Sequence, residues 1–391
     1  MEDKAFDIRP AERICTVNEY YFSRKLKEVA QMNAEGMDII SLAIGSPDMP
    51  PSDSTIQTLC QEAAKPNAHG YQPTIGTPEL RSAMAGFYRR WYGVELDAEK
   101  EILPLIGSKE GILHVTLAFV NPGDQVLVPN PGYPTYTSLS KILGAEVVPY
   151  ELSQKNAWQP DLDALEQTDL SRVKIMWTNY PHMPTGARAM RKTYQALVDF
   201  ALKHNLIIVN DNPYSFILND GEKLSILQVP GAKKCCIEFN SMSKSHNMPG
   251  WRVGMLSTNA QFIQWIMRVK SNIDSGTFRA MQLAAAKAYD NADEWHARAN
   301  VETYAPRRKR PKKSCTPWAA LSTPTRPECS FGDAYPTAMP MWNNSRKRCS
   351  TKHAFSLLPA SFSEAPENAT SASVCAPRKT SSTRRSREYK S

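Results

Sequence analysis

The sequence predicts an α/β fold in which the large domain is a mostly parallel β-sheet flanked by helices. Between residues 107 and 257, short β-rich segments alternate with stretches in which apolar residues recur about every 3.6 positions. Strands and helices that alternate in this way form parallel sheets with both faces covered. The chain of 391 residues also leaves room for a second, smaller domain.

Six segments of this region have the composition of short buried strands. They are Gln125–Val128, Glu146–Val148, Lys174–Trp177, Leu206–Val209, Cys236–Phe239 and Val253–Leu256. Helices are predicted between them, at Glu110–Phe119, Thr135–Leu143 and Thr193–His204.

Polar residues follow three successive strands of this pattern. Asn179 follows one strand, Asp211 follows the next, and Ser241–Lys244 follows a third. Ligands of such sheets bind beyond the carboxyl ends of the strands, so we expect a binding site at this edge. The sequence has no GxGxxG after a strand and no P-loop, which argues against dinucleotide and nucleoside triphosphate folds.

The net charge of +8 comes from the end of the chain. Residues 311–391 hold 13 Lys and Arg against 5 Asp and Glu, and the preceding residues are neutral. The neutral part has no basic stripe with interleaved aromatic residues, so we expect no nucleic-acid partner. No apolar run follows Met1 and none reaches about 20 residues, so we expect a cytoplasmic protein without a membrane partner.

The eight cysteines show no CxxC and no Cys/His spacing of the kind found in zinc sites. Cys235 and Cys236 are adjacent. We therefore expect reduced thiols, and neither disulfides nor a metal.

One segment places a lysine among small hydroxyl residues, with an arginine eight positions on. It reads Ser241-Met-Ser-Lys-Ser-His-Asn-Met-Pro-Gly-Trp-Arg252. An amine can form an imine with an aldehyde, while hydroxyls and a guanidinium hold a phosphate dianion. The segment resembles the Schiff-base lysine signature of the class I/II pyridoxal 5'-phosphate (PLP) aminotransferases of fold type I. The alternative is a solvated lysine, Lys244, in a Ser-rich loop.

Asp211 and Tyr214 lie in Val209-Asn-Asp-Asn-Pro-Tyr214, which resembles the Asp-x-x-Tyr element of this family. The resemblance implies that Asp211 keeps the pyridine nitrogen of the cofactor protonated, so that the ring withdraws electrons from the substrate. It implies that the Tyr214 hydroxyl donates to the phenolate oxygen of the ring. An Asx-Pro turn at a strand end is the alternative.

Two further segments resemble the walls of the family's cofactor site. Gly107-Ser108-Lys109-Glu-Gly precedes a predicted helix and resembles the phosphate cup, with Ser241 and Arg252 on its other side. Pro131-Gly-Tyr133-Pro-Thr-Tyr resembles the element whose first tyrosine stacks on the cofactor ring. The alternatives are a plain helix N-cap and core packing.

Two N-terminal segments complete the resemblance. Ile40-Ser-Leu-Ala-Ile-Gly45 resembles the segment whose glycine approaches the substrate carboxylate. His69-Gly-Tyr71 begins an element whose tyrosine reaches the phosphate of the neighbouring subunit, which implies a homodimer. The six matches occur in the family's order over about 210 residues.

One departure lies within the matched region. Met183 stands where the family usually has the asparagine of Asn-Pro-Thr-Gly. A thioether cannot donate a hydrogen bond to the cofactor or the substrate. His182 or a water molecule could take over that role.

Residues 311–391 do not continue the pattern. They contain four Ile, Val or Leu residues, and this composition alone favours disorder. A frame displaced by one base near Lys309–Pro311, real or from sequencing, is the explanation we favour. Codon degeneracy then permits Cys329–Tyr335, His353–Glu364 and Thr370–Cys375 to have been strand-like segments that resemble the family's small domain. The last would have carried the arginine that binds the substrate α-carboxylate.

The sequence therefore predicts an aminotransferase that moves an amino group between an amino acid and a 2-oxo acid through a Lys244 Schiff base. The alternatives are a C–S β-lyase on the same fold, a PLP-binding protein inactive without the C-terminal arginine, and a polyanion-binding module that uses the basic tail. The predicted divisions are 1–45, N-terminal arm and part of the small domain; 46–285, PLP-binding large domain; 286–310, start of the C-terminal small domain, which is incomplete; and 311–391, the disordered or frame-displaced tail.

Overall fold

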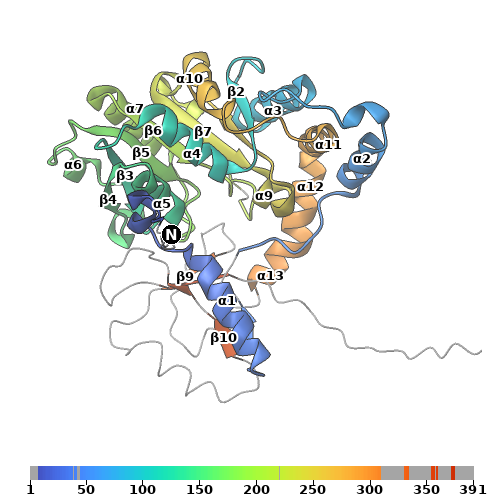
Figure 1. Ribbon diagram of the computed structural model, residues 1–391, viewed down its shortest axis with the longest axis horizontal. Helices are drawn as coiled ribbons and strands as arrows, with labels where there is room; N and C mark the ends of the chain where they lie inside the picture. Colours follow the sequence, from blue (N-terminus) through green and yellow to red (C-terminus); the bar gives the residue numbers. More distant parts are fainter. Residues whose placement is uncertain are drawn as a thin grey trace, which may run out of the picture.

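The computed structural model describes residues 8–37, 39–41, 45–219 and 221–309, together with four short C-terminal strands. Its large domain is built on a seven-stranded sheet in the order β2-β8-β7-β6-β5-β3-β4 (Figure 1). The strands are β2 (Ile102–Leu105), β3 (Gln125–Asn130), β4 (Glu146–Glu151), β5 (Val173–Asn179), β6 (Ile207–Asp211), β7 (Cys236–Ser241) and β8 (Gly254–Ser257).

The sheet is mostly parallel, as predicted. Strands β3 to β7 pair in parallel, and β8 runs antiparallel to both β7 and β2. Each of the six predicted strands is present and continues beyond its predicted carboxyl end, because the polar residues there still take part in pairing. Strand β2 was not predicted. It contains Pro104, which lacks an N–H for pairing, and it lies at the edge of the sheet, where a proline is tolerated.

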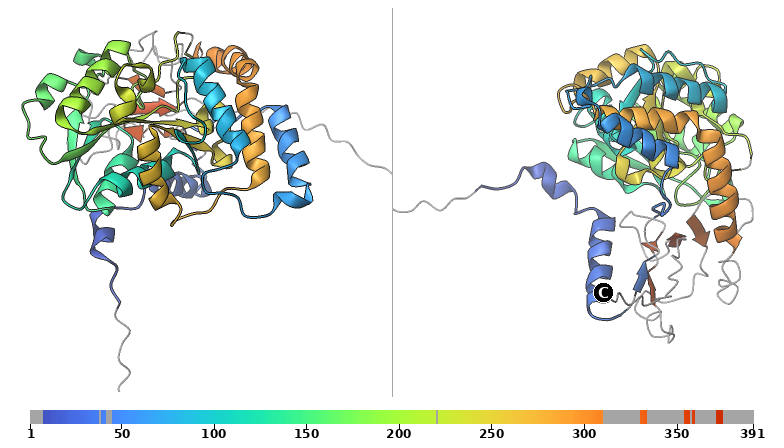
Figure 2. Two further views of the ribbon diagram at one scale, coloured as in Figure 1. Left: turned by 90° about the horizontal axis from the view of Figure 1, so that it is seen from above. Right: turned by 90° about the vertical axis from the view of Figure 1, so that its right-hand side faces the viewer.

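Helices cover both faces of the sheet (Figure 2). On one face lie α3 (Pro78–Tyr92), α7 (Arg191–His204) and α11 (Arg279–Asp290), which share one hydrophobic core with the sheet. On the other face lie α4 (Ser108–Phe119), α5 (Pro134–Ile142) and α10 (Ala260–Lys270), which share a second core. The three predicted helices correspond to α4, α5 and α7.

Short helical segments connect these elements. They are α6 (Leu162–Leu165), α8 (Ala232–Cys235), α9 (Met242–Ser245), η1 (Glu12–Thr16), η2 (Pro66–Ala68), η3 (Gln154–Asn156), η4 (Ile226–Gln228) and η5 (Pro249–Trp251). The remaining helices are α1 (Tyr21–Ala34), α2 (Asp53–Ala63), α12 (Ala292–Arg298), the π-helical η6 (Ala299–Tyr304) and α13 (Ala305–Lys309). Among the described residues, no helix has both the length and the apolar character that crossing a membrane requires.

The last strands of the chain pair with one another and with the N-terminal region. Strand β1 (Ile39–Ser41) pairs in parallel with β10 (Ala354–Ser356), beside α1 and apart from the large sheet (Figures 1 and 2). Strands β9 (Ser330–Asp333), β11 (Leu358–Pro359) and β12 (Ser371–Val374) form an antiparallel sheet. All four C-terminal strands fall within the three segments for which a displaced frame was considered. The division of the chain into domains stays a prediction.

Candidate active site

The polar residues that follow successive strands meet at one edge of the large sheet. Asn179 ends β5 and pairs in register with Asp211, which ends β6. Ser241 ends β7, the next strand of the sheet, and leads directly into α9. The Asn179 side chain donates to the Asp211 carbonyl over 2.6 Å and accepts from the Met183 N–H over 2.9 Å. The Asn179 side chain therefore connects the end of β6 to the loop that follows β5.

The carboxyl group of Asp211 is buried, with 6% of the residue exposed. Its Oδ2 accepts a hydrogen bond from Tyr136 Oη over 2.9 Å, and its Oδ1 has no partner within the part of the chain that the structure describes. Burial raises the pKa of Asp211 to about 7; the Tyr136 hydrogen bond opposes this shift and the buried Glu238 adds to it. A protonated ring nitrogen would satisfy Oδ1 and neutralise the carboxylate.

Lys244 lies in α9, at the same edge. Its Nζ donates to the Gly45 carbonyl over 2.5 Å, so the structure brings together the predicted covalent lysine and the predicted substrate-binding glycine. Ser241 caps α9, since its hydroxyl accepts from the Ser243 N–H over 3.2 Å. The residue that ends β7 thus also caps the short helix that carries Lys244.

The predicted phosphate cup lies at the start of α4. Gly107 has φ +77°, and a Cβ there would lie 2.2 Å from Nη2 of Arg252. The guanidinium of Arg252 donates to Ser243 Oγ over 3.3 Å and to the Ile106 carbonyl over 3.5 Å. Free N–H groups at a helix start and a nearby guanidinium are a suitable environment for a phosphate. Ser108, the first residue of α4, lies at this start.

A residue of the N-terminal segment joins the site. Lys109 Nζ lies 4.0 Å from the centre of the Tyr20 ring. Burial raises the pKa of Tyr20, and the neighbouring Tyr133 adds to this effect. Burial lowers the pKa of Lys109, and Arg252 adds to that effect. Nothing in the sequence around Tyr20 indicated this position, because the contact joins segments far apart in the chain.

The aromatic residues around Asp211 form a second wall. Tyr133 immediately precedes α5, and its ring centroid lies 5.5 Å from that of Tyr136, nearly perpendicular to it. Tyr214 is half-buried. The pKa of Tyr136 is raised by the burial of its own hydroxyl and by Asp211, and Tyr214 adds to this effect. The role of Tyr136 was missed, although it ends the same Pro-x-Tyr-Pro segment that pointed to Tyr133.

Two candidates are placed differently from the rest. Tyr71 is 96% exposed, so it does not join the buried cluster of its own chain. His182 is fully buried, and its ring nitrogens bind Thr185 Oγ1 at 2.8 Å and the Pro131 carbonyl at 3.1 Å. With both nitrogens engaged, His182 does not provide the donor that Met183 lacks.

Glu110, His114 and Asp274 are close enough to share a metal ion. The ammonium of Lys270 lies between two of them instead, 2.5 Å from Glu110 and 2.8 Å from Asp274. These four residues are called the Lys270 cluster below. In this structure the positive charge beside the two carboxylates is the Lys270 ammonium.

Comparison with known proteins identifies the family. The family model "Aminotransferase class I and II" matches residues 37–322. The chain belongs to this family. The protein is therefore a PLP-dependent aminotransferase of fold type I, and the predicted fold class, enzyme class and cofactor are confirmed. Among the described residues, two features fit this cofactor: Asp211 Oδ1, which has no partner there, and the helix start at Gly107 and Ser108.

The aminotransferase resembles enzymes named LL-diaminopimelate aminotransferase. It is 46% identical to that of Dehalococcoides mccartyi strain BAV1 over 285 residues, which are 73% of this chain and 74% of the relative. It is 45% identical to that of Moorella thermoacetica over 288 residues, again 73% and 74%. These relatives lend no support to a β-lyase or to an inactive PLP-binding protein.

Solved structures match the aminotransferase over more of its length. The apo form of BacF from Bacillus subtilis is 30% identical, has a TM-score of 0.86 and covers 94% of each chain. An aspartate aminotransferase mutant from Thermus thermophilus has a TM-score of 0.82, covering 90% of this chain and 92% of its own. At 23% identity, the second likeness bears on the fold alone.

Proposed function

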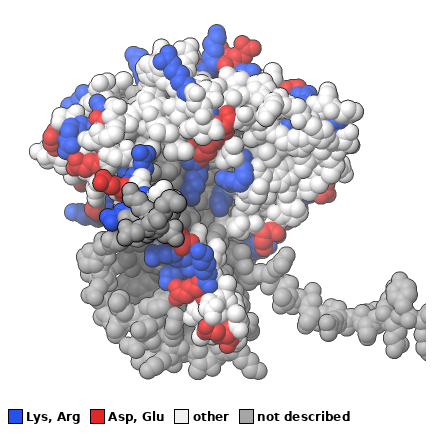
Figure 3. Space-filling view, viewed as in Figure 1, with Lys and Arg blue, Asp and Glu red and all other residues white. Residues whose placement is uncertain are grey.

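We propose that this aminotransferase moves the amino group of LL-diaminopimelate, or of a closely similar amino acid, to a 2-oxo acid in the cytoplasm. The observation that carries the proposal is the identity of 42% to 46% to relatives that bear that name. Figure 3 shows Lys and Arg side chains grouped at the hollow of the large domain that faces α1. A positive field of this kind favours an anionic cofactor and a carboxylate substrate.

When bound, PLP supplies an aldehyde carbon for covalent attachment and a ring that withdraws electrons from the substrate α-carbon. In our proposal Lys244 Nζ is the attachment point and later accepts the proton from the α-carbon of the amino acid. Asp211 Oδ1 holds the protonated ring nitrogen, and Tyr214 donates to the phenolate oxygen. The Gly45 backbone, whose carbonyl accepts from Lys244 Nζ, would lie beside the substrate carboxylate.

The remaining site residues hold the cofactor without moving a proton. Tyr133 packs on the ring. The phosphate is bound by the start of α4, with a hydroxyl or guanidinium on its other side. The residues assigned to it are Gly107, Ser108, Lys109, Ser241 and Arg252.

The attachment point is tested by borohydride reduction of the holoenzyme followed by peptide mapping. We expect a pyridoxyl adduct on Lys244 in the wild type and none in Lys244→Ala. Lys203→Ala, which removes an exposed lysine of α7, is the matched control. An adduct on any other lysine would refute the assignment.

The substrate is tested by amino-group exchange with a 2-oxo acid. We expect LL-diaminopimelate to be turned over with a kcat/KM at least tenfold above those of aspartate and of an aromatic amino acid. Release of a thiol from cystathionine, measured in parallel, distinguishes the β-lyase reaction. Turnover of aspartate in preference to LL-diaminopimelate contradicts the substrate assignment and leaves the aminotransferase class in place.

We also propose a homodimer in which the partner subunit's Tyr71 binds the phosphate. The support is the near-complete exposure of Tyr71 beside Gln72, which bridges to Gly276. Mixing Tyr71→Ala with Lys244→Ala subunits should restore activity, since one site of each mixed dimer then has both residues. The absence of such complementation, or a monomer in sedimentation, would refute shared sites.

A further inference from the structure

The Lys270 cluster connects the start of α4 to the end of α10. Glu110, in the first turn of α4, has its Oε1 2.6 Å from His114 Nε2 and 2.5 Å from Lys270 Nζ. Its other oxygen accepts from the Ile106 N–H. Lys270 is the last residue of α10, and only 3% of its side chain is exposed. His114 and Lys270 are thus buried in this cluster, and Glu110 and Asp274 are partly buried.

Glu110 creates an electrostatic problem for the cup. Although burial opposes it, the hydrogen bonds from His114 and Lys270 lower the pKa of Glu110 to about 2, so the residue is ionised. A carboxylate near a helix start interacts well with the helix dipole, but it repels a phosphate bound at the same end. Lys270 supplies the opposite charge, within direct contact of Glu110.

The cluster also holds the loop that follows α10. Asp274 accepts from Lys270 Nζ over 2.8 Å, and its own N–H donates to the Lys270 carbonyl over 3.0 Å. Two residues later, Gly276 forms the bridge with Gln72, and a Cβ on Gly276 would lie 2.3 Å from the Pro73 carbonyl. Lys270 therefore links the cup to the segment that carries Tyr71.

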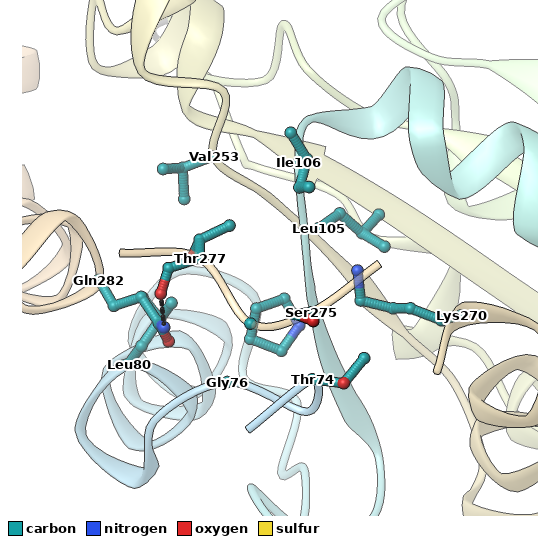
Figure 4. Close-up of a pocket in the computed structure, with 12 residues that line it drawn as sticks. Thr74, Gly76, Leu80, Leu105, Ile106, Val253, Lys270, Ser275, Thr277 and Gln282 are labelled. Atoms are coloured by element: carbon teal, nitrogen blue, oxygen red, sulfur yellow. Dashed lines mark hydrogen bonds between the residues drawn. The ribbon is translucent and has the colours of Figure 1, made fainter. Parts of the chain in front are cut away.

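A small cavity behind the cup lies between these elements. Figure 4 shows Lys270 projecting toward Leu105 from one side, with Ser275 and Thr74 nearby and Ile106 above. The residues that line it include members of the strand before the cup, of the loop after α10 and of the Thr74–Gly76 segment, together with Leu80, Val253 and Gln282. The ion pairs of Lys270 therefore border a cavity that adjoins the cup.

We propose that Lys270 is a positioning residue for the cofactor phosphate: it holds the first turn of α4 and neutralises the negative charge that Glu110 brings to that end of the helix. The proposal rests on the assignment of Ser108 and its neighbours to the phosphate. It extends the site to residues that do not touch the cofactor. Neither the lysine motif nor the Gly-Ser motif indicated them.

The test uses PLP affinity, measured by titration of the apo-enzyme, with circular dichroism as a check on folding. Lys270→Met should weaken PLP binding at least tenfold, because the Glu110 carboxylate at the start of α4 then loses the ammonium that neutralises it. Glu110→Gln should bind PLP as tightly as the wild type or more tightly, since Gln still accepts from the Ile106 N–H. The double variant should bind within about threefold of the wild type.

The rescue distinguishes charge balance from packing. A double variant no better than Lys270→Met would mean that Lys270 does not act by neutralising the charge of Glu110, and the proposal would be wrong. If Lys270→Met does not fold, Glu110→Gln still tests the proposal. The proposal predicts unchanged or tighter PLP binding by this variant, so a tenfold loss of PLP affinity in the folded variant would overturn it. Lys203→Met, which removes an ion pair of 2.6 Å with Glu166 on the surface, is the matched control.

The outcome is separable from that of the proposed function. Ser108→Ala should weaken PLP binding whether or not Lys270 has this role. Normal affinity in Lys270→Met together with a loss in Ser108→Ala refutes the role of Lys270 alone. Unchanged affinity in Ser108→Ala refutes the phosphate assignment itself.

Discussion

Tyr136 Oη donates a hydrogen bond to Asp211 Oδ2 over 2.9 Å, and the Tyr136 ring is stacked on Trp177 with 4.9 Å between centroids. The stacking fixes the ring, and the hydrogen bond fixes which carboxylate oxygen it engages. Oδ1 is left as the acceptor without a partner among the described residues. The aromatic pair therefore determines how Asp211 is presented to the cofactor.

We predict that Tyr136→Phe binds PLP roughly 5- to 30-fold more weakly at pH 7, which corresponds to about 1–2 kcal/mol for a lost hydrogen bond. Because this bond lowers the pKa of Asp211, its removal should shift the pH dependence of binding upward. Titration of the apo-enzyme with PLP between pH 6 and 9 measures both effects. Tyr150→Phe, which removes a buried tyrosine bond to the Trp177 carbonyl, should leave the pH dependence unchanged.

We predict that Asp211→Asn makes the cofactor-free protein more stable at high pH. Burial raises the pKa of Asp211 from 3.8 to about 7, so the folded protein binds a proton between these values that the unfolded chain does not. The free energy of unfolding of the wild type therefore falls as the pH rises through this range. The variant should gain roughly 2–4 kcal/mol at pH 8, at about 1.4 kcal/mol per pH unit.

Denaturant unfolding at pH 8 and pH 4.5 measures this gain. The two proteins should differ little at pH 4.5, where Asp211 is protonated in the folded state. An equal difference at both values would show that the effect is not ionisation. The variant should also lose PLP affinity, so stability and function change in opposite directions.

We predict that acid destabilises the protein through His246. Burial lowers the pKa of this imidazole from 6.5 to about 3, so at intermediate pH the unfolded chain binds a proton that the folded protein does not. The free energy of unfolding should fall as the pH decreases below 6.5, by up to about 1.4 kcal/mol per unit. His246→Phe keeps an aromatic ring against Tyr289 and should reduce the slope between pH 6.5 and 4.5. An unchanged slope would assign the effect to other groups.

We predict a displaced reading frame near the codons for Lys309–Pro311. The family model ends at residue 322, and relatives cover 73% of the chain, whereas the BacF structure covers 94%. Sequencing the gene across these codons in independent isolates is the measurement. An uninterrupted frame in all of them contradicts the hypothesis. A chain with the frame restored should gain affinity for a substrate carboxylate at least tenfold, because a bidentate arginine partner is added.

The sequence was most informative where local pattern and chemistry coincide. Strand–helix alternation predicted the sheet, because buried strands and amphipathic helices differ in period. Asp211 and Lys244 were indicated by short sequence motifs, Asp-x-x-Tyr and Ser-x-Ser-Lys, in which the reactive residue and its neighbours are close in the chain. Tyr20 and Lys270 were not, because their contacts lie 89 and 160 positions away, at Lys109 and Glu110. A buried lysine within an amphipathic helix has no local signal that distinguishes it from an exposed one.

The pairing of β1 with β10 has a consequence for biosynthesis. Ile39 leaves the ribosome more than 300 residues before Ala354, its partner in the parallel ladder. Throughout that interval the backbone edge of β1 is unmatched, and unmatched edges are templates for aggregation. This small parallel ladder therefore cannot form until Ala354–Ser356 has been synthesised, long after β1 itself.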